Sequence, residues 1–373
     1  MSNSFTYLLI KWHYACLNAW LNLLRKLLFK RVGHTTVQRI LIVRKGTLGD
    51  CITVLPVVHA LKEKFPAAVC YLLTENYGAT DIGASEIFEE GTFSEVLTVS
   101  DYSPSALSIK LEELKPDAVI ELPQPLDTLY TQTRNMLYFR LMCGIKQGAG
   151  WQVSTTTLFR KAQLKYRVFK NETERHFQQL QSHGVFLMTS WEFPLIKPTP
   201  FDTLTAIGEL MTFDDRPIAA VAIGAKHQRK RWPVERFVAI AERLVENGWQ
   251  VCWIGNTSDS KHIPLNYAGE NLCGKLSIAE TVALMQHINL FIGNDSGPMH
   301  LAYARNIPVV ALFSLRDYPG KWYPPAHTRH VVLSDKTVPC AICWDKPCSD
   351  SICMKNISID DVWSAIQQLM KNE

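Results

Sequence analysis

The first loop with chemically useful side chains is RKGTLGD at 44–50, directly after an apolar run. Gly46 and Gly49 allow the backbone to turn tightly and let a ligand approach it closely. The pattern is neither G-x-G-x-x-G nor a Walker A loop, so it does not support a dinucleotide or nucleoside triphosphate site. Asp50 has two interpretations. It can cap the following helix, which the local pattern favours, or it can take a proton from a hydroxyl group.

A second loop, GNDSGPMH at 293–300, leads from an apolar run into a helix. Ser296 can cap that helix, and the backbone amides around Gly297 form the kind of helix N-terminus that binds anions. His300 lies about one turn into the helix, where it can donate a hydrogen bond to a phosphate. A half-buried structural histidine is the simpler alternative, but Asp295 and the glycine beside it favour a site.

A third loop, GAKHQRKRWP at 224–233, also follows an apolar run, and five of its ten residues are Lys, Arg or His. A solvated basic loop is the simplest interpretation. The loop nevertheless follows the first predicted strand of the second half of the chain, where a phosphate-bearing ligand is expected in this class of fold. Two loops that favour anions in the same half indicate a nucleoside diphosphate or a similar group.

The chain has ten cysteines and shows no convincing export signal, which indicates a reducing compartment and no disulfide framework. Four of them, spaced C-x2-C-x4-C-x4-C, fall close together: Cys340, Cys343, Cys348 and Cys353. Four thiolates could bind zinc or an iron–sulfur cluster. Structural zinc sites usually pair two C-x2-C knuckles, and only one is present here. We therefore favour a structural or redox-sensitive loop and expect no metal.

The formal charge of +4 is concentrated at the N-terminus. Residues 1–34 contain five basic residues and no acidic one, so the rest of the chain holds 34 basic and 35 acidic residues. A general nucleic-acid binder needs a basic body or a basic stripe. The nearly neutral body therefore excludes nucleic acid as the general partner.

The basic segment 1–34 is also apolar, and its helical spacing predicts an amphipathic helix. The apolar face comprises Leu8, Leu9, Trp12, Cys16, Trp20, Leu23, Leu24, Leu27 and Leu28. Polar residues interrupt it too often for a membrane span. The favoured hypothesis is a helix that lies in an anionic membrane surface, with Arg25, Lys26, Lys30 and Arg31 facing the lipid headgroups. The alternative is a helix packed against the body of the protein or against a partner chain.

The elements that position these loops are short apolar runs alternating with amphipathic stretches. Strands are predicted at 38–44, 68–73, 95–99 and 117–122, and again at 218–223, 250–254, 290–292 and 308–313. Such alternation predicts an α/β protein in which helices cover parallel sheets. The prolines in 194–217 mark this segment as a linker between two halves. Because ligands bind beyond the carboxyl ends of parallel strands, all three loops are expected at such edges.

Three blocks of the sequence carry a resemblance to a known family: ILIVRKGTLGDCITVLPVVHALKEKFP (40–66), GAKHQRKRWPVERFVAIAERL (224–244) and LCGKLSIAETVALMQHINLFIGNDSGPMHLAYARNIPVVALF (272–313). The chain resembles glycosyltransferase family 9, the heptosyltransferases that build the inner core of bacterial lipopolysaccharide. The resemblance implies a GT-B fold with two Rossmann-like domains whose parallel sheets face a central cleft. It also implies inverting transfer from ADP-heptose to a sugar hydroxyl of a lipid-linked acceptor, without a metal or another cofactor.

The sequence pattern and the resemblance together predict a division of the chain. Residues 1–34 form the basic helical extension, 35–200 the acceptor-binding domain, 201–357 the domain that binds the nucleotide sugar, and 358–373 a final helix. The acceptor is lipopolysaccharide core or a lipid A precursor. Together with the basic helix, this implies a cytoplasmic protein held peripherally at the inner membrane.

Residue roles follow by position in the family motifs. Asp50 matches the general base, and Lys230 matches the residue that neutralises the departing diphosphate. The donor-binding positions are Ala225, Lys226, Leu276, Asp295, Ser296, Gly297 and His300, and the acceptor-side loop contributes Gly46, Thr47, Gly49 and Thr53.

Some positions depart from the family pattern. Thr53 stands where the better-known heptosyltransferases I have histidine, and Ala225 and Lys226 replace a pair that often carries hydroxyl groups. These departures leave two alternatives open: a different nucleotide-sugar donor, or a non-catalytic scaffold that binds lipopolysaccharide or a nucleotide sugar.

Overall fold

The computed structural model describes most of the chain as two compact units. Unit 1 comprises residues 1–164 and 172–194, and unit 2 comprises residues 165–171 and 195–373. The described residues are 2–33 (backbone only for 2–7), 37–75, 91–125, 127–154, 168–186, 193, 207–265, 267–326, 328–338, 340, 342–343, 348 and 350–371. Much of the predicted linker, residues 194–206, lies outside them. The chain enters unit 2 briefly at 165–171 before it returns to unit 1, which the sequence did not predict.

Unit 1 is built on a parallel sheet of five strands in the order β3-β2-β1-β4-β5. Their bounds are β1 Arg39–Val43, β2 Val69–Thr74, β3 Glu95–Thr98, β4 Ala118–Glu121 and β5 Gln147–Ala149. The central strand β1 reads RILIV and is buried along four of its five residues. Continuous apolar runs of this kind are typical of parallel strands covered on both faces.

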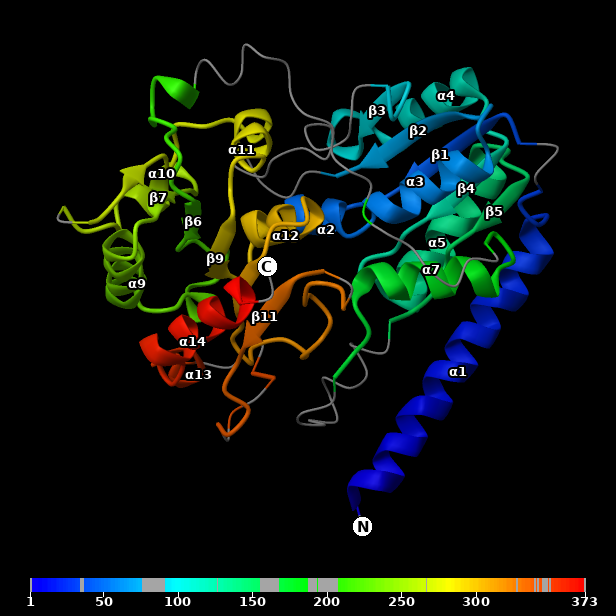
Figure 1. Cartoon of the computed structure of the whole chain (residues 1–373). Helices are drawn as coiled ribbons and strands as arrows, with labels where there is room; N and C mark the ends of the chain where they lie inside the picture. The colour runs from blue at the N-terminus through cyan, green and yellow to red at the C-terminus, as the bar shows by residue number, and fades with distance from the viewer. Residues whose placement is uncertain are drawn as a thin grey trace. The chain divides into compact units, whose positions relative to one another are not determined.

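The helices of unit 1 precede, connect and follow these strands (Figure 1). They are α1 Ser2–Leu28, α2 Leu48–Ile52, α3 Leu55–Lys64, the 3-10 turn η2 Val99–Asp101, α4 Pro104–Leu114, α5 Leu129–Leu137, the π-helical turn η3 Tyr138–Met142 and α7 Glu172–Ser182.

Unit 2 is built on a second parallel sheet, of six strands, in the order β11-β10-β9-β6-β7-β8. Its strands are β6 Ile218–Ala222, β7 Gln250–Trp253, β8 Glu270–Asn271, β9 Leu290–Asn294, β10 Val309–Leu312 and β11 His330–Leu333. Its helices are the 3-10 turn η4 Gln228–Lys230, α9 Val234–Glu246, α10 Thr257–Ser260, α11 Ile278–Leu284, α12 Gly297–Ala304, α13 Ile352–Lys355 and α14 Ile359–Met370. Helix α14 contacts α9, β10 and β11, so the expected final helix is part of the unit 2 core.

All eight predicted strands form, and the two parallel sheets confirm the predicted α/β class. Three strands were missed: β5, β8 and β11. β5 and β8 contain only three and two residues, and β11 is half-buried throughout. Short, half-buried strands lack the apolar run that identifies a central strand.

Helix α1 forms as predicted, but unit 1 covers only one side of it. Leu21 is fully buried and Leu17, Leu24 and Leu28 are partly buried against the unit 1 core. Asn18 adds two hydrogen bonds to the backbone of Val153, one donated at 3.3 Å and one accepted at 3.0 Å. The expectation of a helix packed on the body is thus met for this side. No helix among the described residues is long and apolar enough to cross a membrane.

The unit 1 core also holds a carboxyl group at the end of β4. Glu121 is buried and accepts hydrogen bonds from Asn135 Nδ2 at 2.7 Å and from Trp151 Nε1 at 2.8 Å. Burial raises the pKa of Glu121 to about 7, because the charged form loses its hydration.

We expect Leu21→Ala to destabilise unit 1 by about 2–5 kcal/mol, because a fully buried side chain leaves a cavity behind. Leu27→Ala on the same helix is the matched control. Its side chain is 75% exposed, so the change should stay within about 0.5 kcal/mol. Urea unfolding followed by hydrogen exchange of unit 1 peptides measures both. Equal stability of the two variants would show that α1 does not belong to the unit 1 core.

We expect Glu121→Gln to remove a pH dependence from unit 1. Folded Glu121 binds its proton more tightly than the unfolded chain, whose ordinary pKa is 4.5. The group therefore contributes stability below about pH 4.5 and loses it as the pH rises through about 7, by about 3 kcal/mol. Hydrogen exchange at several pH values should show this decline in the wild type and in the exposed control Glu113→Gln, but not in Glu121→Gln. The same decline in Glu121→Gln would contradict the assignment.

Candidate functional site

In unit 1, the loop after β1 turns sharply at Gly46 and enters α2. Gly46 has a φ of +140°, and a Cβ atom there would lie 2.3 Å from Gln124 Nε2 and 2.5 Å from Asp50 Cβ. Only glycine fits this close approach. Thr47 is the N-cap of α2, so Asp50 is the third residue of the helix and not its cap. The expectation that Asp50 is itself the N-cap is therefore wrong, because Thr47 is the N-cap and Asp50 lies three residues after it.

The carboxylate of Asp50 is held by three donors. Its Oδ2 atom accepts hydrogen bonds from the Thr47 amide at 2.9 Å and from the Thr47 hydroxyl at 3.0 Å. Its Oδ1 atom lies 3.4 Å from Arg44 Nη2. The Asp50 side chain is 14% exposed. These contacts fix the direction of the carboxylate while one edge of it remains open to solvent.

Arg44 is a buried cation that ties this loop to the neighbouring strand. Its Nε atom donates to the Asp50 carbonyl at 3.1 Å, and Nη1 donates to the Leu122 carbonyl at 3.1 Å. Leu122 follows β4, which pairs with β1. A buried guanidinium must find acceptors, so Arg44 joins the carboxyl ends of the two strands.

Helix α7 supplies a further partner of Arg44. His176 Nε2 lies 3.2 Å from Arg44 Nη1 and 3.2 Å from Arg175 Nη2. Burial and the two guanidinium groups lower the pKa of His176 well below its usual value, so its neutral ring can accept from them. Arg175 also donates to the Pro123 carbonyl at 2.7 Å. Sequence reasoning missed this contribution because α7 is more than 120 residues from the loop in the sequence.

Thr53 lies beside this loop as predicted, but its side chain is fully buried. Its hydroxyl donates to the Asp50 carbonyl at 2.8 Å, and its own carbonyl accepts from the Thr173 hydroxyl at 2.6 Å. Because its hydroxyl is buried and bonded to the Asp50 carbonyl, Thr53 stabilises the Asp50 loop and does not face an acceptor. Gly49 is buried within α2.

In unit 2, three of the predicted donor residues meet. Lys230 forms an ion pair with Asp295, whose other oxygen, Oδ1, lies 3.9 Å from His300 Nε2. The exposed fractions of the three side chains are 14%, 7% and 5%. Lys230 follows β6 and Asp295 follows β9, and these strands are paired neighbours. The carboxyl edge of the sheet therefore brings the two loops together, as the sequence predicts.

Asn294 links the same two loops through its side chain. Its Nδ2 atom donates to the Ile223 carbonyl at 2.7 Å, and its Oδ1 atom accepts from the Trp232 amide at 3.0 Å. Trp232 is buried and its indole donates to the Ile357 carbonyl at 2.9 Å. The two ends of the loop 224–233 are thus fixed, which holds Lys230 at the sheet edge.

A further charged group at this edge was missed by sequence reasoning. Asp317 follows β10, the neighbour of β9, and accepts from Trp322 Nε1 at 2.9 Å. Lys321 Nζ lies 3.5 Å from Asp317 Oδ2, and Lys321 is itself buried. Burial alone would raise the pKa of Asp317, but the nearby ammonium groups of Lys321 and Lys230 lower it. The sequence feature that could have identified Asp317 is DYPGKW at 317–322, which lies shortly after a predicted strand.

The other predicted donor residues belong to the two loops that carry this cluster and to the segment before α11. Ser296 is the N-cap of α12, and Gly297 is its first residue. Ala225 is buried and its carbonyl accepts from Arg231 Nε at 3.1 Å, whereas Lys226 is exposed. Leu276 is half-buried, one residue before Ser277, the N-cap of α11.

The four clustered cysteines do not form a metal centre in the described part of the chain. Cys340 is exposed, Cys343 and Cys348 are half-buried, and Cys353 is buried. Among the described residues no group of three or more His, Cys, Asp and Glu side chains could hold a metal ion. Burial raises the pKa of Cys343 and Cys353, which favours their protonated thiol forms.

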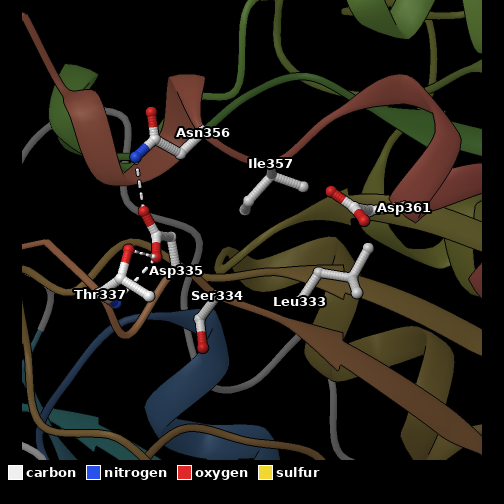
Figure 2. Close-up of a pocket in the computed structure, with 7 residues that line it drawn as sticks. All are labelled: Leu333, Ser334, Asp335, Thr337, Asn356, Ile357 and Asp361. Atoms are coloured by element: carbon white, nitrogen blue, oxygen red, sulfur yellow. Dashed lines mark hydrogen bonds between the residues drawn. The ribbon is translucent and has the colours of Figure 1, made fainter.

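Unit 2 also has a pocket of about 510 Å³ at the end of β11 (Figure 2). Its two carboxylates are already engaged: Asp335 accepts from Thr337 and from Asn356 Nδ2, and Asp361 accepts from Ser358. None of the predicted donor residues lines it. We therefore assign no ligand to this pocket.

Comparison with known proteins gives the family. The model of glycosyltransferase family 9 (heptosyltransferase) matches residues 115–353, more than half of the chain. Lipooligosaccharide heptosyltransferase 2 of Haemophilus ducreyi is 32% identical over 137 residues, which cover 34% of this chain and 39% of that protein. The chain thus spans about two fifths of the length of this curated relative.

Solved structures show the same fold over nearly the whole chain. The glycosyl transferase family 9 structure from Veillonella parvula has a TM-score of 0.71 at 21% identity, covering 92% of this chain and 99% of that one. Escherichia coli ADP-heptose LPS heptosyltransferase II has a TM-score of 0.64 at 18% identity, covering 90% and 99%. These neighbours confirm the predicted GT-B class. With the family match, they establish that the chain belongs to glycosyltransferase family 9.

Proposed function

We propose that this chain is an inverting glycosyltransferase that moves a heptose from ADP-heptose to a sugar hydroxyl of the lipopolysaccharide inner core. The observation that carries the proposal is the cluster of Lys230, Asp295 and His300 at the carboxyl edge of the unit 2 sheet. It places a partly buried cation beside Asp295, next to the helix N-terminus of α12. A departing diphosphate needs such a group to neutralise its growing charge.

Lys230 would neutralise the charge that grows on ADP as the glycosidic bond breaks. An ammonium group has three N–H donors, so Lys230 can keep its ion pair with Asp295 and still donate to a phosphate oxygen. The side chain is only 14% exposed, and its attraction to a phosphate is therefore screened less than in water. Asp295 would also accept hydrogen bonds from the hydroxyl groups of the donor sugar.

His300 would be the second donor to the diphosphate. Its Nδ1 atom lies 2.7 Å from the Tyr303 hydroxyl. Burial raises the pKa of Tyr303, so that hydroxyl stays protonated and can donate to Nδ1. In the proposed arrangement it does so, and the neutral imidazole then carries its proton on Nε2. Because Nε2 faces Asp295, this tautomer would place an N–H donor in the cluster around Lys230.

Asp50 would act as the general base. The acceptor hydroxyl gives its proton to the carboxylate while its oxygen attacks the anomeric carbon from the face opposite ADP, so the configuration inverts. The Oδ1 atom lies 3.4 Å from Arg44 Nη2 and retains lone-pair capacity for the substrate hydroxyl. Gly46, Thr47 and Gly49 would form the backbone around this position.

A lipid-linked acceptor places the reaction at a membrane surface. We infer that the chain works at the cytoplasmic face of the inner membrane and is held there peripherally through residues 1–34. The basic character of that segment supports this location.

We expect Asp50→Asn to lower kcat by about 10²- to 10⁴-fold, because the amide cannot accept the hydroxyl proton but can still accept from Thr47. Asp361→Asn is the matched control, since Asp361 occupies the same third position of a capped helix, in α14. It should leave kcat unchanged. Steady-state transfer to a soluble acceptor fragment measures both variants. Full activity of Asp50→Asn would refute the general-base assignment.

We expect Lys230→Met to lower kcat by about 10²- to 10³-fold, since the diphosphate then departs without a neutralising cation. Lys230→Arg should recover part of the rate, and the exposed Lys261→Met should have no effect. Single-turnover rates, compared with ADP affinity from calorimetry, separate chemistry from binding. A variant that loses ADP affinity but keeps its single-turnover rate at saturating donor would contradict the leaving-group role.

A donor screen tests the proposed function as a whole. ADP-heptose is compared with UDP- and GDP-sugars, each offered with lipopolysaccharide truncated at successive core sugars. Transfer from ADP-heptose supports the proposal. Transfer only from another nucleotide sugar would identify a different donor, and no transfer from any of them would support the scaffold alternative.

A further inference from the structure

The outward side of α1 is apolar, although unit 1 covers only the inward side. Six outward residues are each 50–75% exposed: Leu8, Leu9, Trp12, Trp20, Leu23 and Leu27. The exposed Cys16 lies in the same row. The helix is thus apolar over two adjoining sides, with Lys11, Asn18, Asn22 and Lys26 on the remaining one. An exposed apolar row of this length is typical of a surface that binds a partner or a membrane. The described part of unit 1 does not cover it.

The charges around this row indicate what covers it. Residues 1–49 contain no acidic side chain, and Lys11, Lys26 and Lys30 are exposed. A bilayer with anionic headgroups satisfies both the apolar row and its basic border, and tryptophan is typical of the membrane interface. A second copy of this chain would bring like charges together, which disfavours a symmetric dimer on this face.

Arg25, which the sequence pattern assigned to the lipid headgroups, does not belong to this basic border. It is buried, and its Nη2 atom donates to Asn22 Oδ1 at 3.0 Å. Burial and the nearby Arg31 lower its pKa. Arg31 donates to the Gly184 carbonyl at 3.0 Å and remains exposed.

A second element with exposed apolar side chains lies at the C-terminal end of α1. In η3, Leu141 is 67% exposed and Met142 is 59% exposed. The residue before them, Arg140, donates from Nε to the Leu28 carbonyl at 2.7 Å, which places η3 beside the end of α1. The exposed Lys146 is joined to Lys30 by a backbone hydrogen bond of 2.8 Å. Basic and apolar residues thus alternate around this end as well.

We propose that the outward row of α1, together with Leu141 and Met142, is a single docking surface for an anionic bilayer. The inference deepens the proposed function and rests on its membrane-anchored acceptor. Because the inward side of α1 is part of the unit 1 core, the helix is held rigidly on unit 1 and does not move independently of it. Docking then sets the height and direction of unit 1, and with it Asp50, relative to the lipid surface.

The test is co-sedimentation of the full chain with vesicles of equal parts phosphatidylcholine and phosphatidylglycerol. Deleting residues 1–34 is unsuitable, because it removes the buried Leu21 and Phe29 from unit 1. Point variants avoid this: Leu23→Gln with Leu27→Gln on α1, and Leu141→Gln with Met142→Gln on η3. We expect the α1 pair to lose affinity by at least about tenfold and the η3 pair by several-fold, since each pair loses apolar burial in the membrane. The fully exposed Leu265→Gln in unit 2 is the matched control and should bind like the wild type.

Two further measurements distinguish membrane docking from the proposed reaction and from dimer formation. Binding should weaken in pure phosphatidylcholine and in high salt, because the basic border then lacks its partner. Turnover on a soluble acceptor fragment should be unchanged in all variants, so a failure of the proposed reaction is distinguishable from a failure of docking. Unchanged vesicle binding of the α1 pair would overturn the docking surface, as would a wild-type dimer that the same pair converts to a monomer.

Discussion

The cost of burying charge organises both candidate sites. Arg44 in unit 1 is 1% exposed, and an unpaired guanidinium at that depth would cost several kcal/mol. It is compatible with the fold because three carbonyls, the Asp50 carboxylate and the neutral ring of His176 surround it. The loop conformation that presents Asp50 is therefore the one that satisfies Arg44. In unit 2 the pairs of Lys230 with Asp295 and of Lys321 with Asp317 follow the same constraint.

Local patterns were sufficient to predict the sheets and the loops at their edges. Buried parallel strands such as RILIV have to be apolar along their length, and the chain direction decides which end carries the loop. The meeting of Lys230 and Asp295 followed from that geometry, because β6 and β9 are neighbours. The family resemblance then named the roles that spacing alone left open, above all for Asp50.

Contacts between distant segments could not be predicted in this way. Nothing near His176 or Thr173 in the sequence indicates that α7 returns to unit 1 and closes over the Asp50 loop. The burial of Thr53 has the same origin, since its carbonyl is covered by Thr173. Periodicity likewise identified the apolar residues of α1 but not which of them unit 1 covers. Leu21 and Leu27 are the same residue type on the same helix, and only the tertiary contacts distinguish them.

The pairing of Lys230 with Asp295 affects how strongly a donor diphosphate would be attracted to this site. A carboxylate beside the ammonium keeps Lys230 charged and in place, but it also repels a diphosphate. In the proposed reaction, the donor diphosphate would therefore share Lys230 with Asp295, and His300 and the N-terminus of α12 would supply the additional attraction. As negative charge grows on the leaving diphosphate, the attraction of these groups would grow with it, while the hydrogen bonds that Asp295 is proposed to accept from the sugar would offset its repulsion. A site of this kind would favour the transition state over the bound donor, which is the condition for catalysis.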